Sequence, residues 1–220
     1  NQQDSFSILA GEDALVLVLA DGMGGYTGGE LASRAAVEGC SRAFERKSGL
    51  PGERMKAAVT AANEQVWSAR KKRGEDDEMG TTLVAAWIGA DGLRWVSVGD
   101  SLLLLIREEK MFLLNELHQY SAELERMADE GIISREEALS HPARHSLTSA
   151  LMGKEVPLVD LREECFPLFP GDRVLVASDG VGPYLDSLGP AGMRYLSMLS
   201  AEELVRSVLD GINRDGAPNQ

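Results

Sequence analysis

Two apolar strand-like runs in this chain each end in an aspartate followed by a glycine, and this repeated pattern constrains the fold most. The first run, residues 14–20, ends at Asp21-Gly22 and continues into a glycine-rich stretch. The second run, residues 174–178, ends at Asp179-Gly180. A carboxylate at a strand tip, followed by backbone without bulky side chains, suits a metal or phosphate site. We therefore expect a fold that brings these two strand ends together around one ion cluster.

The charge balance argues against nucleic acid as a partner. The 220 residues include 35 acidic and 22 basic residues, which gives a formal net charge of −13. Nucleic-acid backbones are bound by basic surfaces, and this composition predicts an acidic one. The length favours one domain, and a hydrophobic fraction of 44% is enough for a sizeable core.

The cysteines and the apolar runs indicate a reducing compartment and no membrane contact. Cys40 and Cys165 are the only cysteines, and they form no CxxC pair, so no thiolate zinc site is expected. The longest apolar runs contain about seven residues, far fewer than a membrane span needs. We therefore expect a cytoplasmic location, with no membrane segment in this sequence.

The spacing of apolar residues predicts an α+β fold with antiparallel sheets. Alternating apolar residues predict strands, and apolar residues three or four positions apart predict helices. Strands are expected at residues 5–9, 14–20, 81–88, 93–98, 102–106, 111–114, 158–166 and 172–178. Helices are expected at residues 30–47, 52–73, 121–130, 134–139 and 201–212. The short links between residues 81 and 114 indicate an antiparallel meander, and the two short helices after it look like an insertion.

Seven short motifs, in a fixed order along nearly the whole chain, carry a resemblance to a known family. They lie at residues 1–4, 20–25, 29–33, 80–82, 98–101, 147–151 and 177–181. Each alone is weak, because Asp-Gly is common in ordinary turns. Together they resemble the type 2C metal-dependent serine/threonine protein phosphatases. The resemblance implies a single catalytic domain over residues 1–220. Its fold would be a four-layer sandwich of two antiparallel β-sheets flanked by helix pairs, with a small helical flap insertion at about 117–151.

The resemblance also implies a set of oxygen ligands for two divalent cations, Mn²⁺ or Mg²⁺, with a weaker third. Asp21 would bridge both ions, and the Gly22 carbonyl would bind the second. Asp179 would bind the first ion, and Asp4 would hold waters of the second. Asp100 would help a third, weaker ion together with Asp179. Asp21 and Asp179 would then be catalytic through a metal-bound water.

Residues around these ligands would have supporting roles. By resemblance, Gln3 stands where some relatives place a carboxylate ligand. Thr81 and Thr82 are expected to support the site by hydrogen bonds. Carboxylate and carbonyl ligands favour hard ions. The chain has only three histidines, so a histidine-rich zinc or iron site is not expected, and His118 is interpreted as a polar loop residue.

Each aspartate also has a plainer explanation. Asp21 and Asp179 could simply form turns, since Asp-Gly after a strand is a common turn signal. Asp100 could belong to an ordinary hairpin, because Gly-Asp-Ser lies between two expected strands. Asp4 could be an exposed aspartate near the chain terminus with no role.

The chain also departs from the family pattern. Met23 stands where eukaryotic members carry a histidine proposed as general acid; bacterial members commonly have methionine there, which indicates a bacterial-type enzyme with water as proton donor. Pro183 replaces an aspartate of many members, and Leu102 replaces the usual arginine after Gly-Asp-Ser. The family's phosphate-binding arginine would precede Asn1, and its last metal aspartate would follow Gln220. We therefore expect the sequence to be clipped at both ends.

The favoured interpretation is a phosphatase that hydrolyses phosphoserine or phosphothreonine with a metal-bridged hydroxide. Its partners would be phosphorylated proteins, the products of a serine/threonine kinase. One alternative is a catalytically impaired, phosphatase-like regulatory or phosphoprotein-binding domain. The missing last metal aspartate, Pro183 and Leu102 favour it, and the retained Asp21, Gly22 and Asp179 oppose it. Another is a phosphatase of a sigma-factor pathway acting on an anti-sigma antagonist, which would share the fold and the chemistry.

Overall fold

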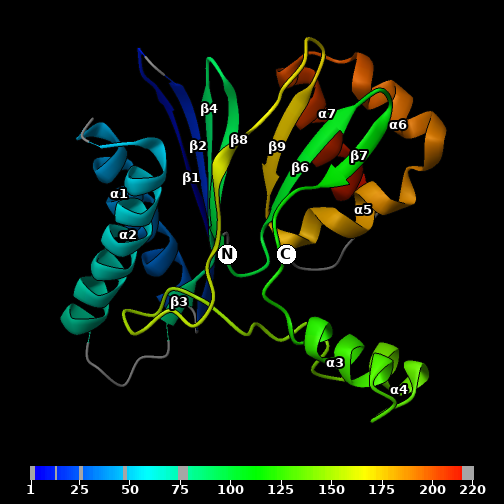
Figure 1. The fold of residues 1–220 in the computed structure, drawn as a ribbon, viewed down its shortest axis with the longest axis horizontal. Helices are drawn as coiled ribbons and strands as arrows, with labels where there is room; N and C mark the ends of the chain where they lie inside the picture. Colours follow the sequence, from blue (N-terminus) through cyan, green and yellow to red (C-terminus); the bar gives the residue numbers. More distant parts are fainter. Residues whose placement is uncertain (1–2, 13, 25–26, 47–48, 74–78, 215–220) are drawn as a thin grey trace.

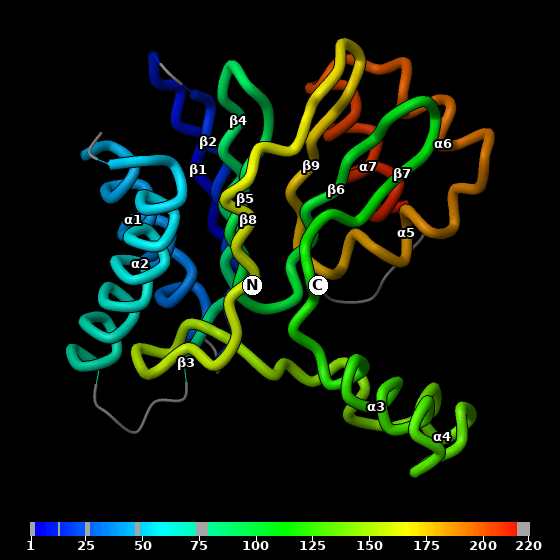
Figure 2. Tube along the Cα trace, in the orientation of Figure 1, coloured from blue at the N-terminus to red at the C-terminus, as the bar shows by residue number. Residues whose placement is uncertain are grey.

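The computed structural model describes residues 3–12, 14–24, 27–46, 49–73 and 79–214, and these form four layers (Figure 1). Two antiparallel β-sheets lie next to each other in the centre, and helices cover the outer face of each sheet. The chain path in Figure 2 passes through the first helical layer early and reaches the second only near the C-terminal end. The expected α+β sandwich of two antiparallel sheets is confirmed.

The first sheet has the strand order β1, β2, β4, β5, β8, and the short strand β3 pairs with the end of β2. These strands are Asp4–Ala10, Ala14–Gly24, Leu83–Gly89, Gly92–Val98 and Asp160–Phe166, with β3 at Met79–Thr81. Helices α1 (Gly28–Glu45) and α2 (Pro51–Arg73) pack on its outer face. One buried cluster joins the helices to the sheet, and many of its side chains are small, such as Ala32, Ala58 and Ala62.

The second sheet has the order β7, β6, β9, which are Lys110–Leu113, Leu102–Arg107 and Arg173–Ala177. Helices α5 (Gly182–Ser187), α6 (Gly189–Met198) and α7 (Ala201–Arg214) cover its outer face. Strand β6 is apolar on both sides, because Leu102 and Leu104 pack toward the helices while Leu103 packs in the cluster that also contains residues of the first sheet. A strand buried on both faces reads as a continuous apolar run, as β6 does.

Helices α3 (Tyr120–Asp129) and α4 (Arg135–Ser140) project away from the sandwich (Figure 1). Within them only Leu124 and Ala138 are buried. Bridges between Gln119 and Leu147 and between Thr81 and Leu151 close the base of this segment. The two expected short helices are therefore confirmed, and the role of 117–151 as a flap stays a prediction. None of the described helices has the length and apolar character that a bilayer crossing requires.

The expected elements match the structure closely, and the differences have physical reasons. Strand β2 does not end at Ala20, because its last residues pair with β3. Helices α5 and α6 were not expected, because the pairs Gly182-Pro183 and Gly189-Pro190 resemble turns. Proline is nevertheless well tolerated in the first turn of a helix, which is where both prolines lie.

The β6–β7 hairpin turns through two glutamates with positive φ, Glu108 at 49° and Glu109 at 64°. Two central residues with positive φ match a type I′ turn, which favours Asn and Gly. We expect the double substitution Glu108→Asn and Glu109→Gly to stabilise the protein by about 1 kcal/mol, because a side chain in this region is strained. The melting temperature should rise by about 2–4 °C.

The matched control is Glu108→Gln with Glu109→Gln, which removes the charges and keeps the strain. The exposed contact of Glu109 with Arg194, at 3.3 Å, is lost in both variants and contributes little. Equal melting temperatures for the two double variants would contradict the strain argument.

Candidate metal centre

The ends of strands β1, β2 and β9 meet at the junction of the two sheets. Asp4 and Asp21 are direct cross-strand partners, and the charge of Asp4 acts on the Asp21 carboxyl group. Ser178 Oγ, at the end of β9, donates a hydrogen bond to Asp4 Oδ2 at 3.0 Å. Asp179 follows and begins the short 3-10 turn η1 (Asp179–Val181). It lies close enough for its charge to act on Asp21. The two strand ends that are remote in sequence are thus neighbours in space.

Asp21 lies where β2 changes partner, between its pairing with β4 and its pairing with β3. Two threonines hold its backbone there. The Asp21 N–H donates to Thr82 Oγ1 at 2.9 Å, and the Thr82 N–H donates to the Asp21 carbonyl oxygen at 2.9 Å. Thr81 Oγ1 donates to the same carbonyl oxygen at 2.8 Å. Thr82 Oγ1 also lies 2.7 Å from Ser101 Oγ, so these bonds tie the Asp21 backbone to the turn after β5.

Only glycine fits at position 22, because β2 meets the start of α1 there. A Cβ at Gly22 would lie 2.1 Å from the Gly29 carbonyl oxygen and 2.7 Å from the Gln3 carbonyl oxygen. The Gly22 N–H donates to the Gln3 carbonyl oxygen at 3.2 Å, and Ser33 Oγ donates to the same atom at 2.6 Å. Gln3 Nε2 donates to the Gly24 carbonyl oxygen at 3.2 Å. Gln3 therefore fastens the glycine-rich end of β2 to α1.

Asp100 lies in the buried turn between β5 and β6. Burial raises its pKa, a hydrogen bond from Gln119 Nε2 at 2.8 Å opposes this shift, and the charge of Asp179 adds to it. His118 holds the same turn, because the Gly99 N–H donates to His118 Nδ1 at 3.0 Å and the His118 N–H donates to the Gly99 carbonyl oxygen at 2.9 Å. Burial lowers the pKa of His118, which keeps the imidazole neutral and able to accept.

The buried role of His118 was missed at the level of sequence. His118 does lie in the loop between β7 and α3, as expected, but the residue is only 5% exposed and bonds to the Gly-Asp-Ser turn. A lone histidine after an apolar strand carries no spacing pattern. Only its position just after the four-strand meander could have suggested that it packs back on the sheet.

Burial and neighbouring carboxylates raise the pKa of Asp21 to about 7. Burial is the largest cause, followed by the charge of Asp4 and the hydrogen bond to it, and then by the charges of Asp179 and Asp100. No basic side chain is among these causes. Negative charge is therefore concentrated around Asp21, and only Asp100 has a basic side chain, His145, among the causes of its pKa shift. A bound metal ion would compensate this charge.

The donor set fits hard divalent cations. Asp4, Asp21, Asp100 and Asp179 offer carboxylate oxygens, and Gly22 offers a carbonyl oxygen that no side chain of its own covers. Within the described ranges, no three acidic, histidine or cysteine side chains form a ready ligand group for one ion. Asp4, Asp100 and Asp179 are nevertheless all close enough for their charges to act on Asp21. A looser set of this kind suits ions that keep part of their water shell.

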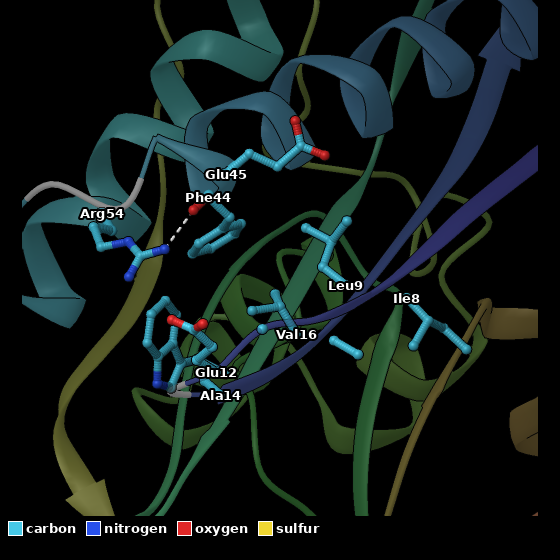
Figure 3. A pocket seen from close by; sticks show the side chains of 11 residues that line it. Ile8, Leu9, Glu12, Ala14, Val16, Phe44, Glu45 and Arg54 are labelled. Carbon is cyan, nitrogen blue, oxygen red and sulfur yellow. Dashed lines mark hydrogen bonds between the residues drawn. The ribbon is translucent and has the colours of Figure 1, made fainter.

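A separate cavity of about 320 Å³ lies toward the opposite end of β1 and β2 (Figure 3). Figure 3 shows Leu9, Val16 and Phe44 among the side chains that line it. The Arg54 guanidinium lies 4.3 Å from the centroid of the Trp87 ring and donates a hydrogen bond to the Phe44 carbonyl oxygen. None of the four junction aspartates lines this cavity, so it is separate from the candidate metal centre.

Comparison with known proteins identifies the family. The family model of protein phosphatase 2C matches residues 1–212, and the chain belongs to this family. The serine/threonine protein phosphatase PstP of Mycobacterium tuberculosis is 35% identical over 185 residues, which cover 82% of this chain and 34% of that protein. The chain thus spans about a third of that relative's length. The resemblance read from the seven motifs is confirmed.

Solved structures support the same conclusion. The crystal structure of the Mycobacterium tuberculosis phosphatase PstP/Ppp matches with a TM-score of 0.78 and 30% identity, covering 100% of this chain and 88% of that chain. A crystal structure of the catalytic domain of PstP in complex with two manganese ions matches with a TM-score of 0.74 and 28% identity, with the same coverage.

We expect Gly22→Ala to destabilise the protein by about 3 kcal/mol or more, because its Cβ would collide with backbone that has no room to move. Urea unfolding followed by circular dichroism measures the loss. Gly182→Ala is the matched control, since its nearest new contact is Leu102 Cδ1 at 3.6 Å. Equal stability of the two variants would contradict the close approach of β2 to α1.

The raised pKa of Asp21 predicts a pH-dependent stability in cation-free protein. Between the ordinary value of 3.8 and about 7, the folded chain holds a proton that the unfolded chain has lost, so stability falls as the pH rises. Asp21→Asn removes this charge. In the presence of chelator it should melt higher than the unchanged protein at about pH 8, and this difference should shrink toward about pH 4.

The exposed Asp210 on α7 provides the control. Asp210→Asn should leave the melting temperature nearly unchanged at both pH values. If Asp21→Asn behaved in the same way, the concentration of charge at the junction would be refuted.

Proposed function

We propose that this chain is the catalytic domain of a metal-dependent phosphatase that hydrolyses phosphoserine and phosphothreonine in proteins. The observation that carries this proposal is the meeting of Asp4, Asp21, Asp100 and Asp179 at one sheet junction of a protein phosphatase 2C fold. The name of the PstP relative and that of the Listeria innocua relative, serine/threonine phosphatase stp, support the reaction class.

In this proposal, two divalent cations bound at the junction, Mn²⁺ or Mg²⁺, supply an activated water and positive charge for the phosphoryl oxygens. The manganese complex of PstP supports this choice of ion. Asp21 would be shared by both ions, with Asp179 on the first and Asp4 with the Gly22 carbonyl on the second. Asp100 and Asp179 would hold a weaker third ion.

The remaining residues would hold this arrangement in place. Thr81 and Thr82 fix the Asp21 backbone, so that its carboxylate keeps one position while charge builds up on the phosphoryl group. Gln3 would act in the same way on the backbone at Gly22. Met23 has no titratable proton, so water would protonate the departing serine or threonine oxygen.

The partners in this proposal are phosphorylated proteins, the products of a serine/threonine kinase. We also propose that the protein acts in the cytoplasm. The free Cys40 and Cys165 are consistent with a reducing compartment.

The proposal predicts a strict need for a hard divalent cation. Chelation by EDTA should abolish hydrolysis of p-nitrophenyl phosphate and of a phosphoserine peptide, and Mn²⁺ should restore both. Asp21→Asn should lower kcat at least about a hundredfold at saturating Mn²⁺ without loss of the fold, because a shared ligand is removed. Asp210→Asn serves as the control and should keep full activity.

Two outcomes would count against the proposal. Rescue by Zn²⁺ alone would oppose a hard-ion centre. No hydrolysis of either substrate at any Mn²⁺ concentration would favour the impaired, phosphoprotein-binding domain instead.

A further inference from the structure

A hollow of about 660 Å³ opens beside the candidate metal centre. Asp100 and Asp179 belong to its lining, so it is continuous with the residues proposed to hold the ions. Most of the remaining lining is apolar and comes from β6, β7, the segment after β7 and α5. These apolar side chains are Leu102, Leu104, Met111, Leu113, Leu117 and Leu185. We call this hollow the leucine groove.

Two apolar residues of the lining lie close in sequence to its acidic residues. Leu102 follows Asp100 by two positions, and Pro183 follows Asp179 by four. The wall of the hollow next to the proposed ion ligands is thus apolar, which suits an apolar occupant.

Acidic groups outnumber basic ones in the leucine groove. Besides Asp100 and Asp179, the lining contains the exposed Asp186 on α5, and its described residues include no lysine or arginine. Its one basic side chain is the exposed His145, whose charge acts on Asp100. Bound cations would compensate Asp100 and Asp179, whereas the charge of Asp186 would remain. An acidic side chain that entered the groove would meet apolar walls and a like charge.

We propose that the leucine groove binds a large apolar side chain of the phosphoprotein substrate, close in sequence to the phosphorylated residue, and rejects an acidic one there. This inference rests on the function proposed above. An extended peptide advances about 3.3 Å per residue, so a hollow that begins at the ion ligands is within reach of residues one to three positions away. Its volume lies in the range of roughly 300–1,000 Å³ typical of ligand sites.

The test uses the full chain with Mn²⁺ and a series of phosphoserine peptides that differ at one position, from three residues before to three residues after the phosphoserine. Each position carries Leu, Ala or Glu in turn. At one position at least, kcat/KM should be about tenfold higher for Leu than for Ala, and lower for Glu than for Ala. The gain should be mainly in KM, because the groove contacts a side chain that does not react.

Binding of the same peptides, measured by fluorescence anisotropy, separates this inference from the proposed function. Preferential binding of the Leu peptide without any hydrolysis would support the groove and overturn the proposed catalysis. Hydrolysis of all peptides at equal rates, with equal binding, would overturn the groove and leave the phosphatase in place. Equal binding with no hydrolysis would overturn both.

Two neighbouring residues on β7 provide a matched pair of variants. Leu113 lines the groove, is 48% exposed and pairs across the sheet with Leu104, another lining residue. Phe112 is 44% exposed and does not line the groove. Leu113→Ser should lower the Leu-over-Ala preference at least threefold, and Phe112→Ser should leave this preference unchanged.

A third variant tests the rejection of acidic side chains. Asp186→Asn removes the exposed carboxylate of the lining and should raise kcat/KM for the Glu peptide relative to the Ala peptide. Melting temperatures show that the variants fold. Equal changes in preference for Leu113→Ser and Phe112→Ser would contradict the assignment of the groove.

Discussion

Hydrogen bonds between the backbone of Asp21 and the hydroxyl groups of Thr81 and Thr82 hold the point where β2 leaves β4 and joins β3. The interior of a strand is normally held by backbone hydrogen bonds to a neighbouring strand. Asp21 lies between the residues of β2 that pair with β4 and those that pair with β3. The threonines satisfy the exposed backbone groups and leave the carboxylate for other partners. The contact of Thr82 with Ser101 extends the same support to the turn that carries Asp100. The geometry of the whole junction therefore depends on two buried hydroxyl groups.

The junction places like charges together where burial makes them costly. The pKa of Asp21 rises because burial and Asp4, Asp179 and Asp100 all disfavour its ionised form. The stability that the apolar layers provide has to offset this cost in the absence of ions. Two independent clusters, one under α1 and α2 and one under α5 to α7, supply that apolar packing on either side of the junction. The two apolar clusters thus stabilise the fold, while the aspartates at the junction between them destabilise it when no ion is bound.

Many of the helices and strands could be predicted from the sequence, because the spacing of apolar residues is a local property. The strands of the meander and helices α1, α2 and α7 have clear periodicities, and the motifs around Asp21 and Asp179 indicated which ends should meet. Strand β3, the helices that begin at Gly182-Pro183 and Gly189-Pro190, and the clamp of His118 on Gly99 were not readable. A Gly-Pro pair can begin a helix or form a turn, so it does not predict either one. Strand β3 and the His118 contact depend on partners that are far away in sequence. The leucine groove is of the same kind, since β6, β7 and α5 form it together.

The hydrogen bond from Ser178 to Asp4 joins positions 174 residues apart. During synthesis, Asp4 and Asp21 leave the ribosome long before β9 does. The early β1–β2 hairpin therefore contains this acidic pair without Asp179, and the candidate metal centre is incomplete. Docking of the two sheets must come before assembly of the site. Assembly is therefore a late folding event, because closing the long chain segment between Asp4 and Ser178 has a high entropic cost. Under the proposed function, a molecule whose sheets have not docked would lack part of the ligand set, so ion binding would indicate completed folding.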